Sequence, residues 1–209
     1  MVEACVYLSP VVKYLEREVL KAMELKTTYF ENTGEENTEE TLRIVKQRAE
    51  ELGIKTVVVA STRGDTAAKA TKVLGGFKII AVSHVAGMRS PNTQTFTEEN
   101  KKIVESKGGI VLTTAHTFSG LSAAMRKKFN TYIIGDIVAN TLRIFSQGMK
   151  VVCEIAVMAA DSGLVRTDED IIAIGGTGRG ADTAVVLRPV NSNDFFDLKV
   201  KEILCKPHF

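Results

Sequence analysis

The sequence predicts an α/β fold: a three-layer α/β/α sandwich whose sheet is mainly parallel and closes with antiparallel strands. Short apolar runs typical of buried strands alternate with amphipathic helical segments between residues 37 and 115. This alternation favours parallel strands joined by right-handed crossovers. The last three apolar runs follow one another closely, which favours antiparallel pairing at that end of the sheet. A length of 209 residues with 44% hydrophobic residues suits one domain of this class.

Residues 1–28 are expected to form an N-terminal helical extension, and residues 29–209 the α/β domain. Pro10 lies where the first turn of a helix accepts proline, and a helical stripe continues with Val12, Leu15, Val19 and Met23. Charged residues interrupt this segment, so we do not expect a secretory signal peptide. The stripe fits a packing helix or an oligomer contact.

The alternating elements begin with a short strand at residues 27–30. Asn37 and Glu40 form a capping-box pattern that predicts a helix start, and Gly53 is a typical glycine after a helix end. The apolar face of this helix is predicted to carry Leu42, Val45, Ala49 and Leu52. Further strands are predicted at 54–60, 77–83 and 110–115, with helices at 64–74 and 97–107.

The second half of the chain has a different pattern. We expect Asp136 to cap a helix that runs to Gln147. An alanine- and methionine-rich helix is predicted over residues 150–162, because Gly163 follows it. The closing strands are predicted at 171–175, 182–187 and 200–204, with no long connection between them.

Composition narrows the classes of function. The chain has 27 basic and 25 acidic residues, so no strongly basic surface or nucleic-acid partner is expected. The longest weakly charged stretch contains Lys150, Glu154 and Asp161, which argues against a membrane span. The three cysteines are too widely spaced to suggest a disulfide framework or a zinc site. We therefore expect a cytoplasmic protein.

Hydroxyl groups and glycines gather directly after four predicted strands, at the sheet edge where open α/β sheets bind ligands. The sharpest cluster lies between the buried strand 54–60 and a helix N-terminus. Free N–H groups and the helix dipole favour an anion there; a capped turn without ligand is equally possible. Asp65 is expected to cap the helix or bond another loop. The candidate residues are Ser61, Thr62, Arg63, Gly64, Asp65 and Thr66.

A glycine-rich run, GGTGRG, follows a later strand at residues 175–180. A dinucleotide fingerprint needs a helix after such a run, whereas a strand is predicted here. The glycines fit either a tight hairpin or a backbone that approaches a ligand closely. The candidate residues are Gly175, Gly176, Thr177, Gly178 and Arg179.

Ser83, His84, Thr114 and His116 follow two neighbouring predicted strands. Histidine titrates near neutrality, so His84 and His116 are candidate acid/base catalysts. Hydrogen bonding of both rings to loop backbone is the favoured alternative. The sequence offers no third ligand near them, so no metal site is predicted. Glu154 is either a buried acid or part of a wet helix face.

These stretches also carry a family resemblance. The turn STRGDTAAKAT after VVVA, and later IIAIGGTGRGADTAVVLRP, resemble the phosphate-binding turn and closing strands of the pyruvate kinase C-terminal domain. With YFENTGEENTEETL and SQGMKVVCEIAVMAADSGL, the chain is similar from Tyr29 to about Leu198 to stand-alone, mostly archaeal pyruvate kinase C-terminal-like proteins. The resemblance implies an α/β/α fold and FMN or a similar phosphorylated ligand. It does not imply pyruvate kinase activity, because a catalytic barrel alone takes about 250 residues.

Three functions stay open at this point. The leading one is binding of a phosphorylated small molecule, FMN above all, with the phosphate on residues 61–66 and the flavin ring near the other clusters. The second is a flavin-dependent oxidoreductase or phosphate-processing enzyme that uses His84 or His116. The third is an oligomeric regulatory or scaffold protein. Because pyruvate kinase C-terminal domains contribute to subunit contacts, the resemblance also implies a homo-oligomer.

Overall fold

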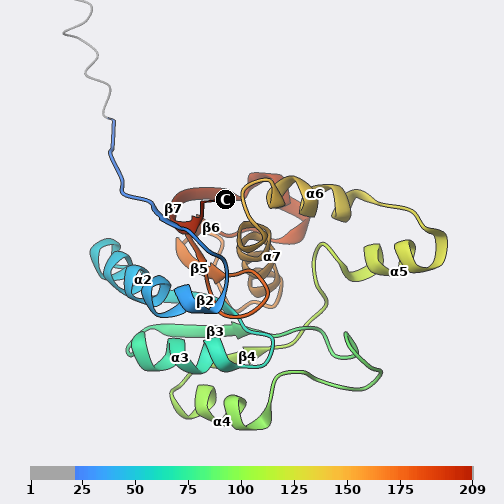
Figure 1. Cartoon of the computed structure of the whole chain (residues 1–209), viewed down its shortest axis with the longest axis horizontal. Helices are drawn as coiled ribbons and strands as arrows, with labels where there is room; N and C mark the ends of the chain where they lie inside the picture. The colour runs from blue at the N-terminus through green and yellow to red at the C-terminus, as the bar shows by residue number, and fades with distance from the viewer. Residues whose placement is uncertain (1–21, 209) are drawn as a thin grey trace, which may run out of the picture.

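The structure is a computed structural model that describes residues 22–208. It forms one sheet of seven strands in the order β1-β7-β6-β5-β2-β3-β4, with helices on both faces (Figure 1). The predicted stripe of the N-terminal extension lies outside the described residues apart from Met23, which is exposed and not helical. Regular structure in the described part begins at β1.

The strands are β1 (Thr28–Phe30), β2 (Thr56–Ala60), β3 (Lys78–Val82), β4 (Ile110–Leu112), β5 (Ile171–Gly175), β6 (Thr183–Arg188) and β7 (Lys199–Pro207). The four strands β2, β3, β4 and β5 pair in parallel. β6 is antiparallel to both of its neighbours, and β1 is parallel to β7. The predicted mainly parallel sheet with antiparallel closing strands is confirmed.

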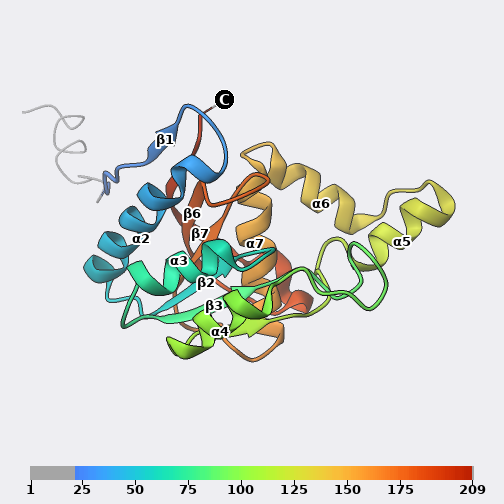
Figure 2. The same ribbon diagram turned by 60° about the horizontal axis from the view of Figure 1, so that its bottom comes forward.

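The helices within the described residues are α2 (Thr38–Leu52), α3 (Asp65–Val73), α4 (Glu98–Ser106), α5 (Gly120–Phe129), α6 (Ile134–Arg143) and α7 (Gln147–Asp161), with 3₁₀ turns η1 (Glu35–Asn37) and η2 (Ser192–Asp197). None of these helices is both long enough and apolar enough to cross a bilayer. Figure 2 shows α2, α3 and α4 on one side of the sheet and α7 on the other.

Alternation of side chains along the strands divides the core into two layers. Val57 and Val59 of β2 pack with Leu42 of α2 and Ala70 of α3. Val58 between them points to the opposite face and packs with α7, because successive strand residues face opposite sides of a sheet. α7 is buried on nearly all sides, which explains why it is apolar around its circumference.

The start of α2 differs from the prediction. Asn37 makes no side-chain cap; its Nδ2 donates to the carbonyl of Asn32 at 2.9 Å. Glu40 binds the Arg43 guanidinium instead of closing a capping box. Leu52, predicted on the apolar face, is 41% exposed because it lies in the last turn, where α2 reaches the edge of the sheet. The predicted end is confirmed: Gly53 is left-handed, with φ 68°.

The region after β4 also departs from the prediction. β4 ends at Leu112 rather than at residue 115, and α5 was not expected at all. α6 runs from Ile134 to Arg143 instead of from 136 to 147. Asp136 lies in its first turn, where its carboxylate accepts a hydrogen bond from Ile133 N. The cap of the next helix is Ser146, whose hydroxyl accepts from Met149 N.

Candidate functional site

A cleft of about 570 Å³ opens at the carboxyl ends of β2, β3 and β5, between α3 and α7. Eleven of the fifteen residues predicted from the sequence line it. They are Ser61, Thr62, Arg63, Asp65, Thr66, Ser83, His84, His116, Gly176, Gly178 and Arg179. Four predicted residues, Gly64, Thr114, Gly175 and Thr177, do not line it.

The Ser61–Thr66 loop joins β2 to α3 along one wall of this cleft. Ser61 N donates to Val82 O at 2.9 Å, which continues the sheet pairing by one residue. Its hydroxyl accepts from Ala67 N at 3.2 Å. Within the described part of the chain, the five backbone N–H groups from Thr62 to Thr66 donate to no protein acceptor. This loop therefore offers a run of donors at a helix N-terminus, the geometry that binds anions.

Gly64 serves the packing of this loop rather than the lining of the cleft. Its φ is +100°, and a Cβ there would lie 2.4 Å from Asn100 Cβ and 2.7 Å from Phe96 Cε1. Asn100 Nδ2 donates to Arg63 O at 3.0 Å and to Asp65 Oδ1 at 3.1 Å. Asp65 thus bonds the helix α4, whereas a helix cap or a bond to another loop was predicted, and α4 holds the loop from outside.

The two predicted histidines meet at the floor of the cleft. Their ring centroids are 5.6 Å apart. His84 Nε2 lies 3.2 Å from Thr62 Oγ1, and His116 Nε2 accepts from Val85 N at 3.3 Å. The backbone bond predicted for histidine therefore exists for His116. Burial lowers the pKa of both rings, and the neighbouring His116 lowers the pKa of His84 further, so both are neutral at physiological pH.

A buried ion pair of α7 lies behind these rings. Lys150 and Glu154 form a salt bridge one helical turn apart, and both side chains are almost fully buried. Glu154 Oε1 accepts from Phe118 N at 3.0 Å, and Glu154 Oε2 lies 3.8 Å from His116 Nδ1. The sequence left Glu154 open and missed Lys150. Opposite charges at i and i+4 in an otherwise apolar helix were the available signal.

The Gly175–Gly180 run forms a hairpin turn between β5 and β6, one of its two predicted alternatives. The buried Asp182 carboxylate ties it down: Oδ2 accepts from Gly34 N at 2.9 Å and from Thr177 N at 3.0 Å. Gly180 packs against Glu35, where a Cβ would lie 2.4 Å from Glu35 Cα. Gly175 packs against α7, because a Cβ at this position would lie 2.9 Å from Gly148 O.

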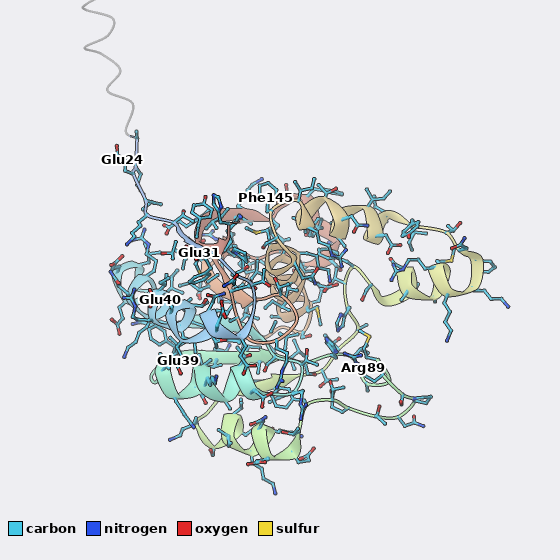
Figure 3. The ribbon with its side chains drawn as sticks, in the orientation of Figure 1. Glu24, Glu31, Glu39, Glu40, Arg89 and Phe145 are labelled. Atoms are coloured by element: carbon cyan, nitrogen blue, oxygen red, sulfur yellow. The ribbon has the colours of Figure 1, made fainter. Side chains whose placement is uncertain are left out.

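Positive charge dominates the cleft. Its lining includes six basic side chains but only three carboxylates, those of Glu35, Asp65 and Glu154. Arg89 extends from the loop after β3 (Figure 3). The lining cations are Arg63, Lys69, Arg89, Arg143, Lys150 and Arg179. Among the described residues, no group of three metal-ligating side chains was found.

The sheet, its hydroxyl-rich βα turn and the cleft at the carboxyl edge define an open α/β domain with its cleft at the ends of parallel strands. The chain belongs to the family described as the pyruvate kinase alpha/beta domain, whose model matches residues 39–187. This match confirms the resemblance to the pyruvate kinase C-terminal domain and agrees with the observed fold.

Solved structures give weaker overlaps. A Cryptosporidium parvum pyruvate kinase is 14% identical with a TM-score of 0.39, over 73% of this chain and 22% of that one. A structure of Cryptosporidium parvum pyruvate kinase in complex with ADP is 14% identical with a TM-score of 0.36, over 85% and 26%. An O-ureido-L-serine synthase is 14% identical with a TM-score of 0.29, over 65% and 50%. The matched region thus spans about a quarter of those kinases, and such overlaps establish no activity.

Proposed function

We propose that the cleft binds a phosphorylated small molecule, specifically FMN, with its phosphate on the Ser61–Thr66 loop. The observation that carries this proposal is the run of five backbone N–H groups, from Thr62 to Thr66, that have no protein acceptor among residues 22–208 and lead into α3. Arg63 and Lys69 line the same part of the cleft, and a guanidinium recognises phosphate through paired donors. A volume of about 570 Å³ lies within the range of small-molecule sites.

The lining also fits the ring of a flavin. Val82, Met88, Val151 and Ile155 supply apolar surface beside the histidines. His84 Nδ1 is buried and has no hydrogen-bond partner among the described residues, and such a group favours a ligand that can pair with it. When bound, FMN supplies electron-transfer chemistry. In this proposal the loop orients the phosphate, and His84 and His116 face the ring.

Titration with FMN and with riboflavin, which lacks the phosphate, tests the proposal directly. Wild type should bind FMN much more tightly. Arg63→Ala should weaken FMN binding about tenfold, because a charged hydrogen bond contributes about 1.5–3 kcal/mol. Arg166→Ala is the matched control, since this exposed arginine is paired with Asp168 outside the cleft. Equal affinity for both flavins in wild type would refute the phosphate loop.

An enzymatic role is the second candidate, favoured by the buried Glu154 behind His116. Glu154 Oε2 lies 3.8 Å from His116 Nδ1, the side from which a carboxylate orients a histidine and stabilises its protonated form. His116→Ala should then abolish NADH oxidation by the FMN-loaded protein and leave FMN affinity nearly unchanged. If the FMN-loaded wild type does not oxidise NADH, this enzymatic role is refuted and ligand binding alone stays the proposed function.

We further propose that this binding takes place in the cytoplasm, in the domain formed by residues 29–209. Cys153 and Cys205 support this compartment, because both are free and buried, and burial raises the pKa of each thiol to about 12. Free thiols of this kind suit a reducing environment.

The identity of the ligand can be tested separately. Mass measurement of the small molecules that are released when protein purified from its own cells is denatured would identify the resident ligand.

A further inference from the structure

Residues 120–145, called here the α5–α6 arm, extend to one side of the molecule in both ribbon views (Figures 1 and 2). α6 packs on the core through Val138, Ala139 and Leu142, whereas Ser122 is the one buried residue of α5. Most of the apolar side chains of the arm are therefore exposed to solvent.

The exposed apolar surface of the arm is large. Six large apolar side chains of the arm are between 58% and 81% exposed: Leu121, Phe129, Tyr132, Ile134, Ile137 and Ile144. Together they expose on the order of 700 Å², close to the ~800 Å² that each partner contributes to a standard protein interface. This sum over the arm compares with about 300–600 Å² for the largest apolar patch of a typical monomeric protein, and Tyr132, Ile137 and Ile144 line a common groove.

The arm also has a shape that another protein surface can fill. Tyr132, Ile137, Thr141 and Ile144 line an open groove of about 400 Å³ along α6. The last three lie on one helical stripe, at spacings of four and three residues. Leu121 and Phe129 of α5 are apolar projections of the same arm. A surface that carries both a groove and apolar projections can pair with a copy of itself about a two-fold axis.

The charges of the arm permit such burial. Asp136 lines the groove, but it forms an ion pair with Arg126 of the same chain. The groove therefore offers no unpaired charge, which would oppose its burial in an interface. Lys127 and Lys128 lie in the last turn of α5 and are exposed, so they suit the wet rim of an interface.

We propose that the α5–α6 arm is the contact surface between two copies of this chain, with the α6 groove of each copy covered by the arm of the other. The exposed apolar area decides for a second copy, because it matches what a stable dimer needs on each side. The proposal does not depend on FMN binding, and it holds or fails whatever the cleft binds.

Sedimentation of the full chain at micromolar concentration tests it. Wild type should sediment at twice the 22.8 kDa of one chain. The double variant Ile137→Asp, Ile144→Asp should sediment as one chain, because each buried charge should weaken the contact at least about tenfold. Phe196→Asp is the matched control: Phe196 is 82% exposed but lies on η2, outside the arm, so its variant should remain a dimer.

Hydrogen exchange of wild type above and below the dissociation concentration gives a test that needs no variant. Amides of residues 120–145 should lose protection on dilution, while those of α2 should not change. A 22.8 kDa species at all concentrations, or an assembly that survives the double variant, would overturn the proposal. So would a monomer whose arm binds phosphatidylserine vesicles, since the patch would then serve a membrane surface.

Discussion

The two turns that border the cleft differ in composition and in what holds them in place. The Ser61–Thr66 loop and the Gly175–Gly180 turn follow the paired strands β2 and β5. The loop has three hydroxyl residues and one glycine, whereas the turn has four glycines and one hydroxyl residue. In the loop, five consecutive N–H groups have no protein acceptor among the described residues. In the turn, the buried Asp182 carboxylate accepts from Thr177 N, and Ala181 N, just after the turn, donates to Thr38 Oγ1. Among the described residues, the N–H groups of Gly176, Gly178, Arg179 and Gly180 have no protein acceptor either. The two turns therefore differ in the buried carboxylate that ties down the second, because no side chain accepts from an N–H group between Thr62 and Thr66 in the first.

The largest expected effect is the loss of the carboxylate that ties the glycine-rich turn. Asp182→Ala leaves Gly34 N and Thr177 N without the acceptor they have at about 3 Å. Unsatisfied buried donors cost about 1–3 kcal/mol each, so the free energy of unfolding should fall by about 3 kcal/mol or more. Urea unfolding measures this. Asp65→Ala, at an exposed position of the Ser61–Thr66 loop, should cost less than about 1 kcal/mol; equal costs would contradict the distinction between the turns.

Two glycines of the turn separate backbone strain from packing. Both Gly178 and Gly180 have positive φ, but a Cβ meets nothing within 4 Å at Gly178 and meets Glu35 Cα at 2.4 Å at Gly180. Gly178→Ala should therefore cost about 1 kcal/mol of unfolding free energy, and Gly180→Ala about 1–3 kcal/mol more. Thermal and urea unfolding provide the comparison. Similar values for both variants would show that the close contact with η1 relaxes freely.

The two arginines of these turns should differ in ligand binding. Arg63→Ala should weaken FMN binding about tenfold. Arg179→Ala should weaken it less than about threefold, because Glu35 Oε2 lies 3.8 Å from Arg179 Nε and offsets its charge. Calorimetric titration with FMN measures the affinity of both variants and so tests this difference. If Arg179→Ala has the larger effect, the glycine-rich turn is the phosphate site.

The smallest effect concerns pH. Burial lowers the pKa of His84 below its ordinary value of 6.5, and the charges of His116 and Arg89 lower it further. The unfolded chain then binds more protons, so stability falls as pH decreases from about 6.5 toward the lower folded pKa. The slope should stay well below ~1.4 kcal/mol per pH unit, because His84 is only half-buried and solvent screens it. His84→Asn should flatten the slope of urea unfolding against pH, and Gly178→Ala should not.

Much of the fold follows from local patterns in the sequence. The helix α2 was predicted from the apolar stripe of Leu42, Val45 and Ala49, and the strand β2 from its apolar run. Both patterns exist because the two elements bury a face in the same core. α5 was missed because Ser122 is its one buried residue, and a helix without a core-facing stripe leaves no periodic signal. Asn37 failed as a cap because η1 runs directly into α2, so Asn37 has helical φ and ψ of −88° and −4° instead of the extended backbone of an N-cap.

The candidate site was predicted in outline, since the carboxyl ends of parallel strands meet at one edge whatever their order. The sequence could not distinguish residues that face the cleft from those that face their own chain. Gly64 and Thr177 illustrate this, as one packs on α4 and the other bonds Asp182. The pair of Lys150 and Glu154 is local to α7, but the approach of Glu154 to His116 is a tertiary contact that no local pattern encodes.

The edge strand β1 has a consequence for how the chain folds during synthesis. β1 pairs with β7, and Thr27 Oγ1 donates to Ile203 O across 176 residues of sequence. A ribosome adds roughly 5–20 residues per second, so β1 must wait on the order of ten seconds for its partner. Throughout that interval β2 and β3 can already pair, because their contacts are local. The first strand to emerge is therefore among the last to join the sheet.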